Sequence, residues 1–219
     1  MIGDERIAAF INSLEKEKTE VLNIIEKQAI DEYVPIIKKP TGSLLRFLIH
    51  TRNPKNILEV GAAVGYSSIL MSEYMPHDCH ITTIEKMPKR IQKAKENIKF
   101  AGKEDKITLL EGDAAQILKN LSLETNKQYD FMFMDAAKGQ YINFLPDIMK
   151  LLQPGGILVS DNVLQDGDVV ESRYGVTRRN RTIHTRMREY LYTITHMEDL
   201  DTIVLPIGDG VTLSTRILL

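Results

Sequence analysis

The chain has 219 residues, the size of a single domain, and 43% of them are hydrophobic. Its 28 basic and 30 acidic side chains give a formal net charge of −2, which excludes a disordered chain or one coated with basic residues. Its one cysteine, Cys79, excludes an internal disulfide and a cysteine-ligated zinc site. No apolar run reaches the length of a membrane span, and the acidic start is unlike a signal peptide. We therefore expect a globular protein of the cytoplasm that has no membrane partner.

The first part of the chain is expected to be helical. An apolar stripe with helical periodicity runs through residues 7–28, is interrupted at Lys18 and ends before Pro35. This stripe predicts one or two helices lying over a sheet. A further helix is expected to start near Thr41, where Thr41 or Ser43 would cap its free backbone N–H groups.

Five short runs rich in β-branched residues follow at nearly even intervals. Their ends are 24 to 26 residues apart, and the stretches between them show helical periodicity, as in residues 87–101, which Pro88 opens and Gly102 closes. Strands that alternate with helices predict right-handed crossovers and a parallel sheet covered on both faces. The predicted strands are residues 56–60, 80–85, 107–111, 129–135 and 156–161.

The end of the chain breaks this alternation. Two strand-like runs, 202–205 and 211–217, are separated only by residues 206–210, too few for a crossover helix, so we expect an antiparallel hairpin. The predicted fold class is α/β: a Rossmann-like, doubly wound, mostly parallel seven-stranded sheet with an antiparallel last strand and N-terminal helices over the site. We expect one domain, with a helical cover at 1–52 and a core at 53–219.

Chemistry-bearing residues gather where the strands end. The first strand runs into the segment 59–67, in which Gly61 and Gly65 permit a tight turn and close approach of a ligand at a helix N-terminus. This G-x-x-x-G spacing also suits a plain strand-to-helix turn. The second strand ends in Glu85, placed to accept the hydroxyl protons of a ribose, and Asp113 follows the third strand. Acids after consecutive strands open into one crevice, which predicts a nucleoside-binding site.

The fourth and fifth strands end in Asp135 and in the pair Asp161 and Asn162. Two neighbouring carboxylates with an amide oxygen, and no histidine or cysteine, fit a hard divalent cation such as Mg²⁺. Lys138 follows closely enough to act as a general base at the same site. The alternatives are that Asp135 orients a cofactor, that Asp161 caps the following turn, and that Lys138 is a surface lysine.

These residues resemble the class I S-adenosylmethionine-dependent methyltransferases, and within them the metal-dependent O-methyltransferases related to caffeoyl-CoA and catechol O-methyltransferases. The resemblance implies S-adenosyl-L-methionine as cofactor and Mg²⁺ or another hard divalent cation at Asp135, Asp161 and Asn162. It makes Lys138 the base, with Asp135 beside it in the catalytic site. The positions that it assigns to the cofactor are Ile37, Glu59, Gly61, Gly65, Ser67, Glu85, Asp113, Ala114 and Asp135.

An arginine-rich segment follows the expected metal loop. Between Glu171 and Glu189 there is no acid but there are six arginines. Arginine suits phosphate through bidentate hydrogen bonds, so this segment favours a nucleic-acid acceptor. An arginine-decorated surface helix or a dimer interface would have the same composition. The expected RNA contacts are Arg173, Arg178, Arg179 and Arg181.

More closely, the chain resembles bacterial tRNA 5-hydroxyuridine methyltransferases, through the segments 34–36, 135–141, 161–164 and 206–210. That resemblance implies methylation of 5-hydroxyuridine at the tRNA wobble position to 5-methoxyuridine. A wobble base lies in a single-stranded loop and reaches a crevice without unpairing of a duplex. The alternative acceptor is a small catechol or phenol, whose turnover would be insensitive to salt, whereas RNA binding weakens as salt rises.

Two readings from other classes remain. A nicotinamide-dependent oxidoreductase would need a glycine where Ala63 stands. A non-catalytic RNA-binding module with a vestigial cofactor pocket would bind S-adenosylmethionine without methyl transfer, and the intact Asp135, Asp161 and Asn162 count against it. We expect the protein to form a homodimer.

Overall fold

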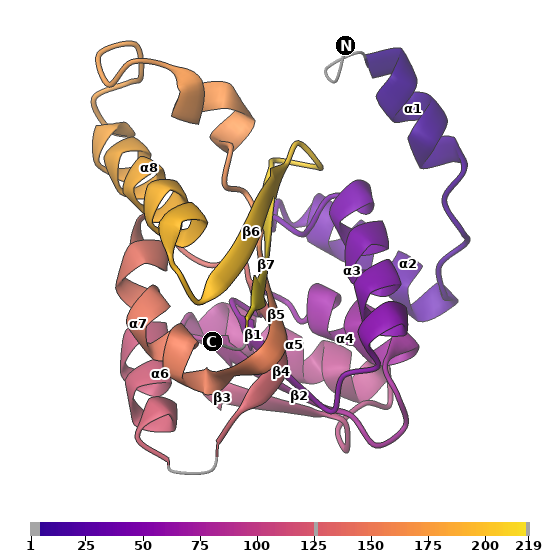
Figure 1. Ribbon diagram of the computed structural model, residues 1–219. Helices are drawn as coiled ribbons and strands as arrows, with labels where there is room; N and C mark the ends of the chain where they lie inside the picture. The colour runs from indigo at the N-terminus through magenta and orange to yellow at the C-terminus, as the bar shows by residue number, and fades with distance from the viewer. Residues whose placement is uncertain (1–4, 125–126, 218–219) are drawn as a thin grey trace.

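The computed structural model describes residues 5–124 and 127–217, in which seven strands form one sheet with helices on both faces (Figure 1). The strands are β1 (Asn56–Val60), β2 (His80–Glu85), β3 (Ile107–Glu111), β4 (Tyr129–Met134), β5 (Leu152–Ser160), β6 (Leu200–Leu205) and β7 (Val211–Arg216). The helices are α1 (Glu5–Ser13), α2 (Glu20–Asp31), α3 (Lys39–Arg52), α4 (Tyr66–Tyr74), α5 (Pro88–Phe100), α6 (Ala114–Ser122), α7 (Tyr141–Leu151) and α8 (Arg181–His196), with short 3-10 turns η1 (Lys138–Gln140) and η2 (Gln165–Val170).

The strand order is β3-β2-β1-β4-β5-β7-β6, and this confirms the predicted Rossmann-like fold class. Strands β1 to β5 pair in parallel, while β7 is antiparallel to both β5 and β6. The order reverses between β1 and β4, and a ligand crevice in an open α/β sheet forms outside the carboxyl ends of the strands at this point. Any site on this sheet is therefore expected beyond the ends of β1 and β4.

Alternate residues of the strands enter two separate cores. Ile57 on β1 and Phe131 on β4 pack with α2, α3 and α4, whereas Leu58 and Met132 pack with α6, α7 and α8 on the other face. Because side chains on both faces of these strands are buried, consecutive residues are apolar. The strands could therefore be predicted from nearly continuous apolar runs in the sequence. No helix within the described ranges is long and apolar enough to cross a membrane.

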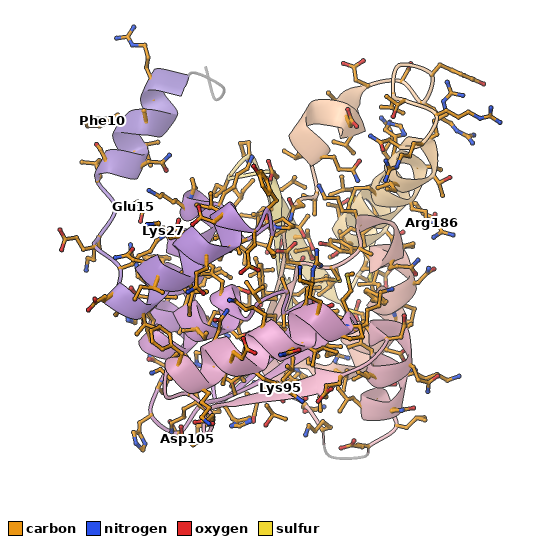
Figure 2. All side chains as sticks on the ribbon, turned by 180° about the vertical axis from the view of Figure 1, so that it is seen from behind. Phe10, Glu15, Lys27, Lys95, Asp105 and Arg186 are labelled. Carbon is orange, nitrogen blue, oxygen red and sulfur yellow. The ribbon has the colours of Figure 1, made fainter. Side chains whose placement is uncertain are left out.

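The helical cover at the start of the chain is only partly as predicted. Helix α2 buries Leu22 and Ile25 against the body of the protein. Helix α1 instead projects from it, with Phe10 64% exposed and pointing away from the rest of the molecule (Figure 2). The prediction that the whole apolar stripe lies over the sheet is therefore wrong for α1. The stripe shows that α1 is amphipathic, but periodicity cannot show which surface covers an apolar face.

Helix α3 begins two residues earlier than the capping signal suggested. Its N-cap is Lys38 and its first turn contains Pro40, whose fixed φ angle favours that position, and no side chain caps it. The prediction that Thr41 or Ser43 caps the helix is wrong, because both residues lie inside it. The Thr41 hydroxyl is instead directed to Asp161, and that of Ser43 to Glu15.

Helix α5 supports the glycine loop that follows β1. The buried Asn97 side chain donates a hydrogen bond from Nδ2 to the carbonyl oxygen of Val64, at 2.8 Å. Gly65 has a φ of +81°, and a Cβ built there would lie 3.6 Å from Ala94 on the same helix. The conformation of the loop thus depends on a polar contact and on close packing, both made with α5.

We expect Asn97→Ala to lower the free energy of unfolding by about 1–2 kcal/mol, because a buried hydrogen bond is lost. Urea unfolding of the purified protein measures this change. Gln92→Ala on the exposed side of the same helix, which removes a bond to Glu96, serves as control and should change stability by less than about 0.5 kcal/mol. Equal effects of the two variants would contradict a support role for Asn97.

Candidate active site

The glycine loop brings the ends of β1 and β4 into close contact. Gly61 has a φ of +107°, and a Cβ at this position would lie 2.0 Å from the carbonyl oxygen of Asp135. No side chain fits there, so glycine is required by both conformation and space. The loop then turns through Gly65, the N-cap of α4, which leaves backbone N–H groups at the start of that helix.

Glu59 lies below this loop and is fully buried. The hydroxyls of Ser68 and Thr83 donate hydrogen bonds to its Oε2, while Oε1 is buried without a partner among the residues that the structure describes. Burial raises the pKa of Glu59, the hydroxyls around it oppose this effect, and the charge of Asp135 adds to it. The site therefore contains a carboxylate oxygen that a donor group of a ligand would satisfy.

Glu85 is oriented by backbone amides at the mouth of the crevice. Its Oε2 accepts from Ala63 N, and its Oε1 accepts from Lys86 N and Met87 N, all at 2.9 Å. The end of β2 is thus joined to the glycine loop. Asp113 lies one strand further out, where it caps α6 by accepting from Ala115 N at 2.9 Å, and Ala114 is the first residue of that helix.

The structure brings Asp135, Asp161 and Asn162 together just beyond β4 and β5. Asn162 Nδ2 lies 2.8 Å from Asp135 Oδ1, and Asn162 N lies 2.8 Å from Asp161 Oδ1. Asn162 has a φ of +62°, a left-handed conformation that asparagine tolerates better than most residues. This turn presents its amide and the two carboxylates to the same space.

The surroundings of the two carboxylates raise the pKa of both. Burial raises the pKa of Asp135, although the hydrogen bond from Asn162 and the charge of Lys138 lower it. Burial also raises the pKa of Asp161 to about 7, and the charges of Asp135 and Asp209 add to this effect. Lys138 on η1 is thus a positive charge near Asp135, and its role as a general base stays a prediction.

Within residues 5–124 and 127–217, no three His, Cys, Asp or Glu side chains form a group that could hold a metal ion. The expected donor set contains only two carboxylates, and its third member is the side chain of Asn162. The metal assignment therefore depends on this amide and stays a prediction.

Three residues at the site were not predicted as part of it. Thr41 Oγ1 lies 3.5 Å from Asp161 Oδ1. The buried Tyr141 hydroxyl lies 3.0 Å from the carbonyl oxygen of Asp161 and 3.2 Å from that of Met134, and so joins the ends of β4 and β5. Asp209 comes from the turn between β6 and β7. Tyr141 and Asp209 both lie in segments that the resemblance had singled out, but a resemblance of segments assigns no role to their members.

The arginine-rich segment divides into exposed and anchored parts. Arg173, Arg178 and Arg179 are exposed in the loop between η2 and α8. The Arg181 guanidinium lies over the Tyr174 ring, 5.7 Å from its centre. On α8 itself, Arg186 Nη1 donates to the carbonyl oxygen of Gly139 in η1 at 3.1 Å. The helix is therefore fixed to the turn that carries Lys138, while the loop leaves its arginines accessible.

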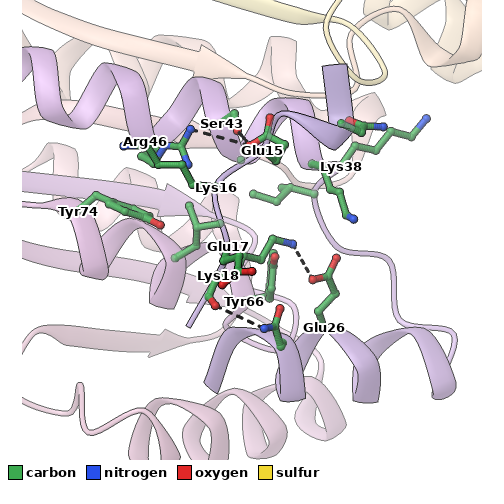
Figure 3. Close-up of a pocket in the computed structure, with 16 residues that line it drawn as sticks. Glu15, Lys16, Glu17, Lys18, Glu26, Lys38, Ser43, Arg46, Tyr66 and Tyr74 are labelled. Carbon is green, nitrogen blue, oxygen red and sulfur yellow. Dashed lines mark hydrogen bonds and ion pairs between the residues drawn. The ribbon is translucent and has the colours of Figure 1, made fainter. Parts of the chain in front are cut away.

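A cavity of about 470 Å³ lies between the segment that follows α1 and the helices α3 and α4 (Figure 3). An ion pair between Lys18 and Glu26 at 2.6 Å closes one side of it, and Lys18 lies 5.5 Å from the centre of the Tyr66 ring. Of the predicted site residues only Ile37 lines this cavity. This cavity is thus separate from the ends of β4 and β5, where the carboxylates lie.

We expect Asp161→Asn to stabilise the cation-free protein increasingly as pH rises. The pKa of Asp161 is raised on folding, so the wild-type protein loses stability as pH rises from about 4 to about 7, and asparagine cannot ionise. The difference in unfolding free energy between variant and wild type should grow by about 2 kcal/mol between pH 5 and pH 8.

Urea unfolding in the presence of a chelator measures this difference, and Asp147→Asn is the matched control. Burial tends to raise the pKa of Asp147, but Ser122 and Lys150 lower it overall, so this group is ionised throughout the range. The control difference should not change between pH 5 and pH 8. A constant difference for Asp161→Asn as well would show that folding does not raise the pKa of Asp161.

The chain matches the O-methyltransferase family over residues 12–217. It is 33% identical over 181 residues to a caffeoyl-CoA O-methyltransferase of Stellaria longipes, covering 80% of this chain and 74% of the relative. It is 35% identical over 130 residues to a catechol O-methyltransferase of Niastella koreensis, covering 59% of each chain.

Among solved structures, the O-methyltransferase TomG from Streptomyces achromogenes, in complex with SAM, superposes with a TM-score of 0.86 at 25% identity, covering 100% of both chains. The match to the family spans nearly the whole chain and includes every candidate site residue. The chain therefore belongs to the O-methyltransferase family, with the S-adenosylmethionine-dependent enzymes of the caffeoyl-CoA and catechol type.

Proposed function

We propose that the protein transfers the methyl group of S-adenosylmethionine to a hydroxyl of a small phenolic acceptor that has a second oxygen beside it, with the help of a hard divalent cation. The observation that carries this proposal is the meeting of Asp135, Asp161 and Asn162 next to the glycine loop. Relatives named for catechol and caffeoyl-CoA favour a phenolic acceptor over tRNA, the acceptor that the resemblance of the sequence had placed first.

The crevice between the glycine loop and Glu85 suits the cofactor. Gly61 and Gly65 leave the backbone open to close approach, and the amide-held Glu85 carboxylate is placed to accept from ribose hydroxyls. The unpaired Oε1 of Glu59 would accept a hydrogen bond from a donor group at the methionine end. Ser67 on α4 and Ile37 before α3 complete this set, with Asp113 and Ala114 toward the adenine.

The carboxylate pair suits a hard cation. Two aspartates with raised pKa values and an asparagine amide supply only oxygen ligands once the amide is turned, and a dication would offset the repulsion between the acids. When bound, such a cation lowers the pKa of an acceptor hydroxyl and fixes the direction of its attack. We assign Asp135, Asp161 and Asn162 to this role.

The reaction itself is an in-line displacement. The acceptor oxygen attacks the methyl carbon, the carbon–sulfur bond breaks with its electron pair going to sulfur, and S-adenosylhomocysteine leaves. The protein must hold the oxygen about 3 Å from the methyl carbon and accept its proton. Lys138 on η1, beside Asp135, is the residue that we assign to take this proton.

We expect Lys138→Met to lower kcat for a catechol acceptor by about 10²- to 10⁴-fold, because a general base is removed. Binding of S-adenosylhomocysteine, followed by calorimetry, should stay unchanged in this variant. Labelled S-adenosylmethionine and a catechol panel, with and without a chelator, provide the assay. Methyl transfer that continues in the presence of the chelator would show that the reaction needs no cation. Full activity of Lys138→Met would show that Lys138 is not the general base.

A tRNA acceptor is the second candidate, and the exposed Arg173, Arg178 and Arg179 are the observation that favours it. These side chains lie in the loop before α8, and Arg186 on α8 contacts the turn carrying Lys138. An RNA strand presenting its base to the crevice would bring its phosphates toward this loop. The arginines would then position the strand and the crevice would select the base.

If tRNA is the acceptor, replacing these three arginines by alanine should reduce the slope of log affinity against log salt by about 2, at about 0.7 for each lost phosphate contact. Binding of hydroxyuridine-containing tRNA at several salt concentrations measures the slope. The control removes three exposed charges elsewhere, through Lys95→Ala, Lys99→Ala and Lys119→Ala combined. Equal slopes for the two triple variants would contradict a tRNA acceptor. Transfer of the label from S-adenosylmethionine to catechol but not to tRNA would contradict it as well.

A further inference from the structure

The turn between β6 and β7, residues 206–210, is packed between two other parts of the site (Figure 1). A Cβ at Gly208 would lie 2.6 Å from Thr41 Oγ1 on α3, and a Cβ at Gly210 would lie 2.2 Å from Leu164 Cγ in the loop after β5. Both glycines have positive φ angles. The turn therefore touches the segment that begins α3 on one side and the loop with Asp161 and Asn162 on the other.

Hydrogen bonds fasten the turn to the loop after β5. Val163 N donates to the carbonyl oxygen of Gly210, and Leu164 N donates to that of Asp209, both at 3.0 Å. On the opposite side, the Asp209 carboxylate pairs with the ammonium group of Lys38, the N-cap residue of α3. Asp209 thus contacts the loop after β5 through its backbone and the start of α3 through its side chain.

The Asp209 carboxylate also acts on the reacting end of the crevice. Its charge raises the pKa of Asp135 and of Asp161, so the three acids are close enough to repel one another. The Asp209 side chain is only 17% exposed, and Lys38 supplies positive charge next to it. Loss of this lysine contact would remove positive charge beside a carboxylate that repels two others.

We propose that Asp209 is a positioning residue whose ion pair with Lys38 holds the start of α3 against the loop after β5. The segment that it holds contains Ile37, assigned to the cofactor, and Thr41, which contacts Asp161. Without the pair, fewer contacts join the start of α3 to the loop after β5. The residues around the cofactor are then less ordered, and its affinity is lower. This inference rests on the proposed function, because the assignment of Ile37 to the cofactor belongs to that proposal.

The test is a double-mutant cycle on the full-length protein, with S-adenosylhomocysteine as the titrated ligand in calorimetry. Asp209→Asn and Lys38→Met each remove the pair and leave the backbone hydrogen bonds in place. Each should weaken binding about three- to fivefold, and the double variant should be no weaker than either single one, because both remove the same interaction. Lys150→Met, which breaks an ion pair with Asp147 on α7, is the control and should bind like wild type.

A structural readout accompanies the titration. Amide hydrogen exchange over residues 37–42 and 161–164 should be faster in Asp209→Asn and Lys38→Met than in wild type and Lys150→Met. Unchanged affinity in both variants, additive losses in the double variant, or a lower Tm with wild-type affinity would each overturn the inference. If the wild-type protein binds no cofactor, the proposed function is wrong. The hydrogen exchange rates then decide alone: faster exchange in the two variants supports the positioning role of the Lys38–Asp209 pair, and unchanged exchange overturns it.

Discussion

A buried carboxylate, Asp161, and a half-buried one, Asp135, repel each other, and the site is built around this constraint. Asp135 and Asp161 lie at the ends of adjacent parallel strands, where a doubly wound sheet directs its ligands, and neither is fully neutralised by the protein. Folding must hold them there against their own electrostatics. The contacts of Tyr141, Asn162 and Asp209 at the same place are the means by which the chain does so.

Most of the fold could be predicted from the sequence because the central strands β1, β2, β4 and β5 are buried on both faces. Such strands are continuous apolar runs, and their regular spacing revealed the crossovers before any contact was known. The carboxylates were predicted for the same reason, since strand ends of a parallel sheet share one edge. Residues such as Glu85 and Asp135 could therefore be assigned to one edge of the sheet from their positions alone.

What could not be predicted depends on contacts between distant segments. Thr41 looked like a helix cap, because a hydroxyl near a helix start usually is one, and only the fold reveals its approach to Asp161. Helix α1 was expected over the sheet, because periodicity reports an apolar face without its partner. The Lys38–Asp209 pair joins residues 171 positions apart, and no local pattern indicates it.

The hydrogen bonds of the Tyr141 hydroxyl join the ends of β4 and β5 without depending on the charges of the two aspartates. Its hydroxyl contacts the main-chain carbonyl oxygens of Met134 and Asp161, and the backbone N–H of Ala136 donates to it. An amide substituted for either acid would leave these hydrogen bonds intact, so the neighbouring strand ends keep their spacing when the charges are removed. The charge of each acid can therefore be removed separately while the ends of β4 and β5 stay joined. For the same reason, substitutions during evolution can change the charge of this site without changing the sheet.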